Sequence, residues 1–375
     1  MIIENITNGL NTTKKAALYY KTEPYYTNVD SYVHTNNWEI LQSINILNRR
    51  GYSVDLLDRG IHNWAPKLSY DIFLGLGVGN TGRNFVRWAT ASRAKQKVLL
   101  SMGPQPDVSN KLVHMRYEMF NKRTGQHAPP MRTVEAVTGD QFIEIINTAD
   151  FVFNIGEKNT PSYNSFAKYG KPVLNFYPSV SPAVQFRPDW IETRDLNSFL
   201  CFAGNGFICK GVDLVVESFL NNPTKQLHIC GPNTEKAFFN YYGDLINKAP
   251  NIKYHGFITP GGKVFNELAA KCSFVIFHSA AEGCCTSVAT AIKAGLVPII
   301  NPWTGICINN QDGIVLSEDG ILIENISDGV KKASSMSDAA YEQMLSHTLK
   351  KSELFSQQSF IKSYAAALDT VIGEE

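Results

Sequence analysis

Two turns in the second half of the chain carry side chains that could bind a phosphorylated ligand. The first turn, FAGNGFICKGVD, places Lys210 beside several glycines. The second, HSAAEGCCTS, places Glu282 just before an expected helix. Glycines let the backbone approach an anion closely, a lysine supplies a mobile positive charge, and the first NH groups of a helix lack intrahelical partners. These residue types together indicate an anion site. The alternative for the first turn is a plain glycine turn with a solvated lysine, and for the second it is a surface glutamate that stabilises the helix dipole.

Strands and helices that alternate along the chain must position these turns. Apolar strands are expected in the first half at 16–20, 53–57, 72–76, 98–101, 151–155 and 172–176, and in the second half at 199–203, 227–230, 252–256 and from 274. Helical spacing appears from Trp38, at 140–148 and 161–169, from Val212, from about Glu235, at 263–270 and beyond Asp328. Alternation of this kind predicts parallel sheets covered by helices, which bind ligands at the carboxyl ends of the strands.

The length and one irregular segment predict the domain organisation. At roughly 100 to 200 residues per domain, 375 residues favour two domains. The segment 177–194 has three prolines and no periodicity, as expected of a linker. We therefore predict an α/β fold of two Rossmann-like doubly wound domains that face a central cleft. We expect residues 1–185 to form the first domain, residues 195–350 the second, and residues 351–375 a C-terminal helix that packs back toward the first domain.

Composition limits the classes of partner and site. A formal net charge of +1 gives no electrostatic argument for nucleic acid. The seven cysteines are odd in number and contain no CxxC pair, so we expect reduced thiols in a cytoplasmic protein and no metal site. The chain shows no secretory leader and no apolar run of about 18 residues, so a membrane span is not expected.

The order and spacing of the motifs resemble a known family. It is the fourth family of retaining nucleotide-sugar glycosyltransferases, or glycosyl transferases group 1, whose members have the GT-B architecture of two Rossmann-like domains. The matching elements follow one another over about a hundred residues: Gly204-Asn205 through Lys210-Gly211, Ile229 to Gly231, Tyr254 to Ile258, Ser279 to Gly283, and Ala294 to Ile299.

The resemblance implies a donor site in the second domain. Lys210 would contact the diphosphate and Glu282 the sugar hydroxyls, as the two catalytic residues. The base would lie against the backbone near 256–258. The implied donor-binding set is Gly204, Asn205, Gly211, Gly256, Phe257, Ile258, Gly283, Cys284, Cys285, Thr286 and Thr290, with the NH groups around 284–286 facing the phosphate or the sugar. A lysine and helix NH groups would stabilise the departing diphosphate, so neither a cofactor nor a metal is expected.

The sequence also departs from the family pattern. Thr290 stands where a second glutamate usually holds the ribose, and Asn205 stands where an arginine usually accompanies the lysine. His34-Thr35 replaces a glycine pair, and Ser101-Met102 stands where a histidine is common. Either a basic residue elsewhere compensates for the missing arginine, or the donor is unusual, or the protein binds a donor without turning it over.

Candidate acceptor-side residues lie on loops of the first domain. We select His34, Asn80 and Gln105, and each has a role as a loop or cap residue as its alternative. Cys284 and Cys285 have no visible partner base, which favours packing over nucleophilic catalysis.

The leading hypothesis is a metal-independent retaining hexosyltransferase that uses a nucleoside diphosphate sugar and a glycan, lipid-linked or small-molecule acceptor. The alternatives are a catalytically impaired GT-B protein that acts as a sugar-nucleotide-binding or scaffold module, and a different enzyme on this fold such as an epimerase or a phosphorylase. The segments NRRG and RWATASRAKQK are candidates for a peripheral contact with the inner face of a membrane, and a solvated helix face is the alternative for both. The sequence does not indicate an oligomeric state.

Overall fold

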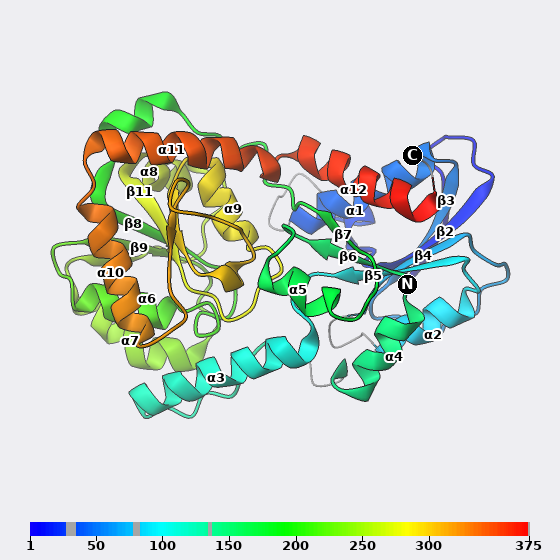
Figure 1. Cartoon of the computed structure of the whole chain (residues 1–375), viewed down its shortest axis with the longest axis horizontal. Coiled ribbons are helices and arrows are strands. Elements are labelled where there is room, and N and C mark those ends of the chain that lie inside the picture. Colours follow the sequence, from blue (N-terminus) through cyan, green and yellow to red (C-terminus); the bar gives the residue numbers. More distant parts are fainter. Residues whose placement is uncertain (28–34, 78–82, 134–136, 374–375) are drawn as a thin grey trace. The chain divides into compact units, whose positions relative to one another are not determined.

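The structure is a computed structural model that describes residues 1–27, 35–77, 83–133 and 137–373, and it divides the chain into two compact units. Unit 1 comprises Met1–Asn110, Val134–Ser179 and Gln357–Glu375. Unit 2 comprises Lys111–Thr133 and Val180–Ser356. Each unit is an α/β layer structure built on one sheet (Figure 1).

Unit 1 contains a seven-stranded sheet in the order β1-β3-β2-β4-β5-β6-β7 within the described residues. The expected strands all form, with the bounds β2 (Lys14–Tyr20), β3 (Tyr52–Asp58), β4 (Ile72–Leu76), β5 (Gln96–Ser101), β6 (Phe151–Ile155) and β7 (Val173–Phe176). These six strands pair in parallel. The edge strand β1 (Ile2–Ile6) pairs antiparallel with β3 and was not expected, because it is held mainly by this pairing and has no buried apolar run.

Helices pack on the sheet of unit 1. They are α1 (Thr35–Arg49), α2 (Arg83–Ala91), α4 (Asp140–Thr148), α5 (Pro161–Ala167) and α12 (Gln357–Ile372), with the 3-10 turn η1 (Glu23–Tyr25). The last helix, α12, belongs to this unit because its aromatic side chains pack on the sheet. Tyr364 lies 5.5 Å from Phe153 and 5.4 Å from Phe176 between ring centroids, and Phe360 lies 5.7 Å from Trp38 of α1.

Unit 2 contains a six-stranded parallel sheet in the order β10-β9-β8-β11-β12-β13 within the described residues. Its strands are β8 (Asp195–Phe202), β9 (Gln226–Cys230), β10 (Ile252–Tyr254), β11 (Cys272–Phe277), β12 (Val297–Ile300) and β13 (Ile314–Val315). The chain adds β9 and β10 on one side of β8 and then adds β11 on the other side. The boundary between β8 and β11 is therefore the topological switch point, where open α/β sheets bind ligands.

The helices of unit 2 follow the expected alternation. They are α6 (Val212–Leu220), α7 (Lys236–Lys248), α8 (Lys263–Lys271), α9 (Thr286–Lys293), α10 (Leu322–Ser334) and α11 (Asp338–Ser352), with the 3-10 turns η3 (Pro188–Thr193), η4 (Pro302–Thr304) and η5 (Glu353–Phe355). The helix α3 (Pro106–Thr124) begins in unit 1, and its residues from Lys111 onward cluster with unit 2.

The units differ from the predicted domain ranges. Residues 111–133 cluster with unit 2 although they lie inside the predicted range 1–185. Arg116 and Arg123 of α3 explain this assignment, because their partners are side chains and carbonyls of unit 2. The boundary near residue 180 also lies earlier than expected, since the Val180 NH donates to the Phe355 carbonyl over 2.9 Å.

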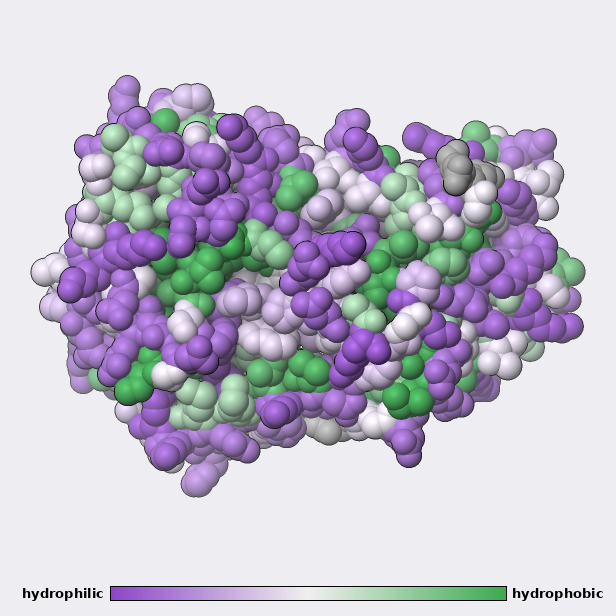
Figure 2. All heavy atoms as spheres, viewed as in Figure 1, coloured by the Kyte–Doolittle hydropathy of each residue, from purple (hydrophilic) through white to green (hydrophobic). Residues whose placement is uncertain are grey.

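Of the two basic segments proposed for a membrane contact, RWATASRAKQK has apolar side chains in the core of unit 1. Trp88 and Ala89 of α2 are at most 1% exposed. In the other segment, Arg50 is ion-paired with Asp369 of α12. The membrane contact stays a prediction, with a solvated helix face as its alternative. None of the described helices is long and apolar enough to cross a membrane. On the face drawn in Figure 2, apolar patches are interspersed with hydrophilic residues.

A buried carboxyl group of unit 1 is expected to make stability depend on pH. Burial raises the pKa of Glu39 to about 7, although two hydrogen bonds from Ser179 and the charge of Lys21 oppose this shift. The folded protein therefore keeps a proton that the unfolded chain releases near pH 4.5. Between about pH 4.5 and 7 the free energy of unfolding is expected to fall as pH rises, by up to about 1.4 kcal/mol per pH unit.

The conservative variant Glu39→Gln isolates this contribution, because its amide oxygen can accept the same hydrogen bonds from Ser179 without titrating. Urea unfolding at several pH values is expected to show a shallower decline for the variant in this window. Equal slopes for the two proteins would show that Glu39 is not the titrating group.

Candidate functional site

The turn that carries Lys210 and the turn that carries Glu282 both lie at the switch point of unit 2. Strands β8 and β11 are direct neighbours, with Phe199 paired to Phe274. Lys210 follows the carboxyl end of β8, and Glu282 follows the carboxyl end of β11. A hydrogen bond of 2.8 Å from the Ala280 NH to the Cys209 carbonyl joins the two turns directly. The fold therefore places the predicted catalytic residues in one site.

Lys210 and Glu282 form a nearly buried ion pair. The Lys210 Nζ donates to Glu282 Oε1, and the side chains are only 8% and 11% exposed. The Lys210 Nζ also lies 5.5 Å from the centre of the Phe277 ring. An ammonium group that a carboxylate holds in place in a nearly buried position is a preorganised partner for an anion.

A third charged side chain, which was not predicted, joins this pair. Arg132 Nη1 lies 3.2 Å from the same Glu282 oxygen that Lys210 contacts. Burial alone would raise the pKa of Glu282, but the charges and hydrogen bonds of Lys210 and Arg132 outweigh burial and lower it to about 2. The carboxylate is therefore ionised at neutral pH. Two cations against one anion leave a net charge of +1 on these three side chains.

The glycines of the site have different physical roles. Gly211 has a φ of +71°, and a Cβ at this position would lie 2.2 Å from the His278 carbonyl oxygen, so it permits close packing of the two turns. Gly204 and Gly256 border open space, because a Cβ on either would meet nothing within 4 Å. The backbone at these two positions is thus open to a ligand, whereas Gly211 serves the packing.

One predicted amide contact of the helix start is wrong. The Cys285 NH donates to the Thr304 carbonyl over 3.0 Å, so it cannot face a phosphate or a sugar. The 3-10 turn η4 packs against this segment and also accepts from the Glu282 NH, through the Trp303 carbonyl at 2.9 Å. The side chains of Cys284 and Cys285 are buried, and Gly283 before them is buried as well. The helix itself begins at Thr286, whose role toward a donor stays a prediction.

Other donor-side candidates differ in accessibility. Phe257 is 57% exposed, and the neighbouring Ile258 is buried. Thr290 is only 5% exposed and donates its hydroxyl proton to the Thr286 carbonyl over 2.7 Å. Asn205 is exposed and accepts a hydrogen bond of 2.9 Å from Thr234. An exposed ring beside the open Gly256 is available for a base, whereas the Thr290 hydroxyl is already engaged within its helix.

Only one of the three acceptor-side candidates can be placed. His34 and Asn80 lie outside the described residues. Gln105 is 1% exposed and caps α3: its Oε1 accepts from the Val108 NH at 3.0 Å, and its Nε2 donates to Asp107. The cap role that the sequence left open for Gln105 therefore accounts for its side-chain contacts.

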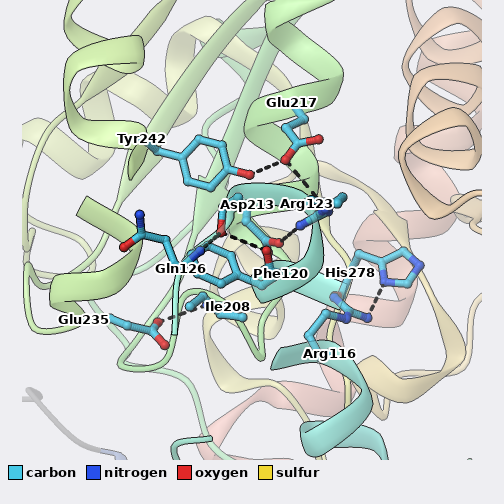
Figure 3. A network of polar contacts seen from close by, with 11 residues as sticks. Arg116, Phe120, Arg123, Gln126, Ile208, Asp213, Glu217, Glu235, Tyr242 and His278 are labelled. Carbon is cyan, nitrogen blue, oxygen red and sulfur yellow. Dashed lines mark hydrogen bonds and ion pairs between the residues drawn. The ribbon is translucent and has the colours of Figure 1, made fainter. Parts of the chain in front are cut away.

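A buried polar network fastens α3 to the two turns of the site (Figure 3). Arg116 is 2% exposed and donates to the carbonyl oxygen and to Nδ1 of His278, at 2.8 and 3.0 Å. Burial, and then the charge of Arg116, lower the pKa of His278 to about 3, so its ring is neutral and Nδ1 accepts. His278 directly follows β11, so this contact holds the start of the Glu282 turn.

The same network continues to α6 and α7. Arg123 is ion-paired with the fully buried Asp213 and lies 3.7 Å from Glu217. Tyr117 donates to Glu235, which also accepts from the Ile208 NH at 3.0 Å in the Lys210 turn. Acidic and basic side chains at the two ends of α3 are a sequence signal for this helix. Nothing in the sequence spacing indicates its partners, which lie about 90 to 160 positions away in the chain.

Neither a metal cluster nor a disulfide appears among the residues that the structure describes. No group of three or more His, Cys, Asp or Glu side chains is placed there to hold a metal ion. The seven cysteines are free thiols.

Comparison with known proteins identifies the fold. No protein-family model matches the chain, and no curated protein matches it in sequence. Solved structures match it well. Sucrose-phosphate synthase from Thermosynechococcus elongatus aligns with a TM-score of 0.64 and 12% identity, over 97% of this chain and 100% of that chain. WaaG, a glycosyltransferase involved in lipopolysaccharide biosynthesis, aligns with a TM-score of 0.55 and 15% identity, over 96% and 100%.

The Staphylococcus aureus protein TarM, solved with fondaparinux, alpha-GlcNAc-glycerol and UDP, aligns with a TM-score of 0.53 and 13% identity. The match covers 80% of this chain and spans only 55% of TarM. These likenesses show that the chain has the GT-B fold, as the sequence predicted.

Proposed function

We propose that this protein is a glycosyltransferase that moves a hexose from a nucleoside diphosphate sugar to a glycan, lipid-linked or small-molecule acceptor. The observation that carries the proposal is the Lys210–Glu282 pair at the switch point of a GT-B fold. Similar structures include one solved with UDP and one glycosyltransferase of lipopolysaccharide biosynthesis, which supports the same class of donor. The proposed location is the cytoplasm.

The proposed reaction retains the configuration of the sugar. The acceptor oxygen attacks the anomeric carbon on the face from which the diphosphate leaves, and the acceptor proton passes to a phosphate oxygen. The bond between the anomeric carbon and the diphosphate oxygen breaks, and negative charge accumulates on the leaving group. Lys210 is preorganised to stabilise this charge, Glu282 would accept hydrogen bonds from the sugar hydroxyls, and no enzyme nucleophile is required.

A non-catalytic binding or scaffold protein is the second candidate. Thr290 and Asn205 favour it, because both stand where the glycosyltransferase family usually has charged residues that contact the donor. Uncharged groups make weaker hydrogen bonds than ionised ones by roughly a factor of two.

Calorimetry combined with product analysis separates the two candidates. Sugar conjugates of UDP, GDP and ADP are titrated into the protein, and release of the nucleoside diphosphate is then measured with and without a mixture of glycan and lipid-linked acceptors. The proposal predicts binding of at least one donor and acceptor-dependent release. Binding without release would favour the non-catalytic candidate, and absence of binding to every donor would refute the proposed glycosyltransferase.

A further inference from the structure

We propose that Arg132 is the second cation of the donor-diphosphate site and takes over the charge that Asn205 does not supply. The inference rests on the proposed function, because it assigns a residue to the same donor site. Arg132 follows the C-terminal end of α3 in the sequence, about 70 residues before the turn that holds Asn205.

The geometry brings Arg132 to the place in question. Its Nη1 lies 3.2 Å from Glu282 Oε1, the oxygen that Lys210 also contacts, so both cations converge on one point. Its side-chain stem lies against the turn that contains Asn205. A Cβ on Gly206 would lie 3.2 Å from Arg132 Cδ. The guanidinium group is therefore next to the turn in which the glycosyltransferase family usually has its arginine.

Arg132 is held in this position and still reaches solvent. Its side chain is 44% exposed, compared with 8% for Lys210, so a ligand can contact it. The preceding segment is fixed by two hydrogen bonds between Asn121 and Ala128, at 2.8 and 3.1 Å. Arg132 itself has a φ of +68°, a left-handed conformation that is costly for a residue other than glycine and persists where its surroundings impose it.

The two cations of the site could exchange the Glu282 carboxylate for the diphosphate of a donor. In the free protein Glu282 faces both cations. A nucleoside diphosphate carries more negative charge than one carboxylate, and arginine can bind phosphate oxygens with two parallel NH groups. On donor binding, Arg132 and Lys210 would share the diphosphate, while Glu282 would be released toward the sugar hydroxyls. Glu282 thus keeps the two cations together when no donor is bound.

The test measures the affinity of whichever of UDP, GDP and ADP the wild-type protein binds most tightly. Arg132→Ala is expected to weaken this affinity about 10- to 100-fold, because a hydrogen bond between two charged groups is lost. Arg187→Ala is the matched control. Arg187 also lies in unit 2 and is paired with a carboxylate, but it belongs to an exposed pair with Asp189 and should leave the affinity unchanged.

The double variant Arg132→Ala/Asn205→Arg separates a ligand contact from a structural role. It returns an arginine to the family position and is expected to restore most of the lost affinity, whereas support of the fold by Arg132 would not be restored in this way. An unchanged affinity of Arg132→Ala, or a loss that Asn205→Arg does not restore, would overturn the inference. If the wild-type protein binds none of the three diphosphates, the proposed function fails and this inference fails with it.

Discussion

Replacement of Lys210 by alanine is expected to lower the turnover number about 100- to 1000-fold with the best donor. The ammonium group is nearly buried beside Phe277 and is positioned before the reaction begins. Loss of one preorganised donor to a developing negative charge costs roughly 3 to 4 kcal/mol of transition-state stabilisation. Turnover is measured as release of the nucleoside diphosphate per mole of folded protein.

Loss of Lys210 also leaves Glu282 with one cation fewer, so stability must be measured separately. The double variant Lys210→Ala/Glu282→Ala removes both charges of the pair and is expected to regain part of the lost melting temperature without regaining turnover. Lys263→Ala is the control, because Lys263 is highly exposed on α8. An unchanged turnover number for Lys210→Ala would contradict the catalytic assignment.

Arg123→Ala is expected to reduce the free energy of unfolding by about 3 to 5 kcal/mol. Asp213 is fully buried and its principal ion-pair partner is Arg123, so the substitution leaves the carboxyl group inside unit 2 without that partner. Burial already raises the pKa of Asp213 to about 6 although Arg123 opposes the shift, so the variant must either bury an unpaired charge or protonate this carboxyl group. Removal of one partner from a buried pair has costs of about this size, because the remaining charge is not solvated. Denaturation in urea, followed by circular dichroism, measures the change.

Two comparisons control the Arg123 result. Arg187→Ala breaks an exposed pair in the same unit and should cost less than about 1 kcal/mol. The double variant Arg123→Met/Asp213→Leu removes both charges of the buried pair, and it should cost less than Arg123→Ala because no uncompensated carboxylate remains. A cost below about 1 kcal/mol for Arg123→Ala would show that the network in Figure 3 does not anchor α3.

The fold could be predicted from the sequence where the buried side chains of an element form a regular apolar pattern. The strands β4 and β6 and the helix α4 have the predicted bounds, because continuous apolar runs and helical spacing record their burial. The edge strand β1 left no such pattern, since pairing with β3 accounts for it. The sequence also did not predict that residues 111–133 belong to unit 2, because this assignment depends on partners of α3 that are distant in the sequence.

The site could be predicted where its residues follow strand ends. Lys210 and Glu282 were found because each lies in a turn at the carboxyl end of a strand, and the neighbouring positions of β8 and β11 bring them together. Arg132 was missed because it lies in a loop between other elements, with no motif to mark it. The Cys285 amide was misassigned because a helix start predicts free NH groups, and the sequence does not show that the Thr304 carbonyl takes one of them.

A crystal structure of the protein soaked with the sugar nucleotide that binds most tightly tests the central claim most directly. The account predicts that the diphosphate lies at the carboxyl ends of β8 and β11, in contact with Lys210, and that Glu282 turns toward the sugar. A diphosphate bound elsewhere, with the Lys210–Glu282 pair intact, would contradict the account.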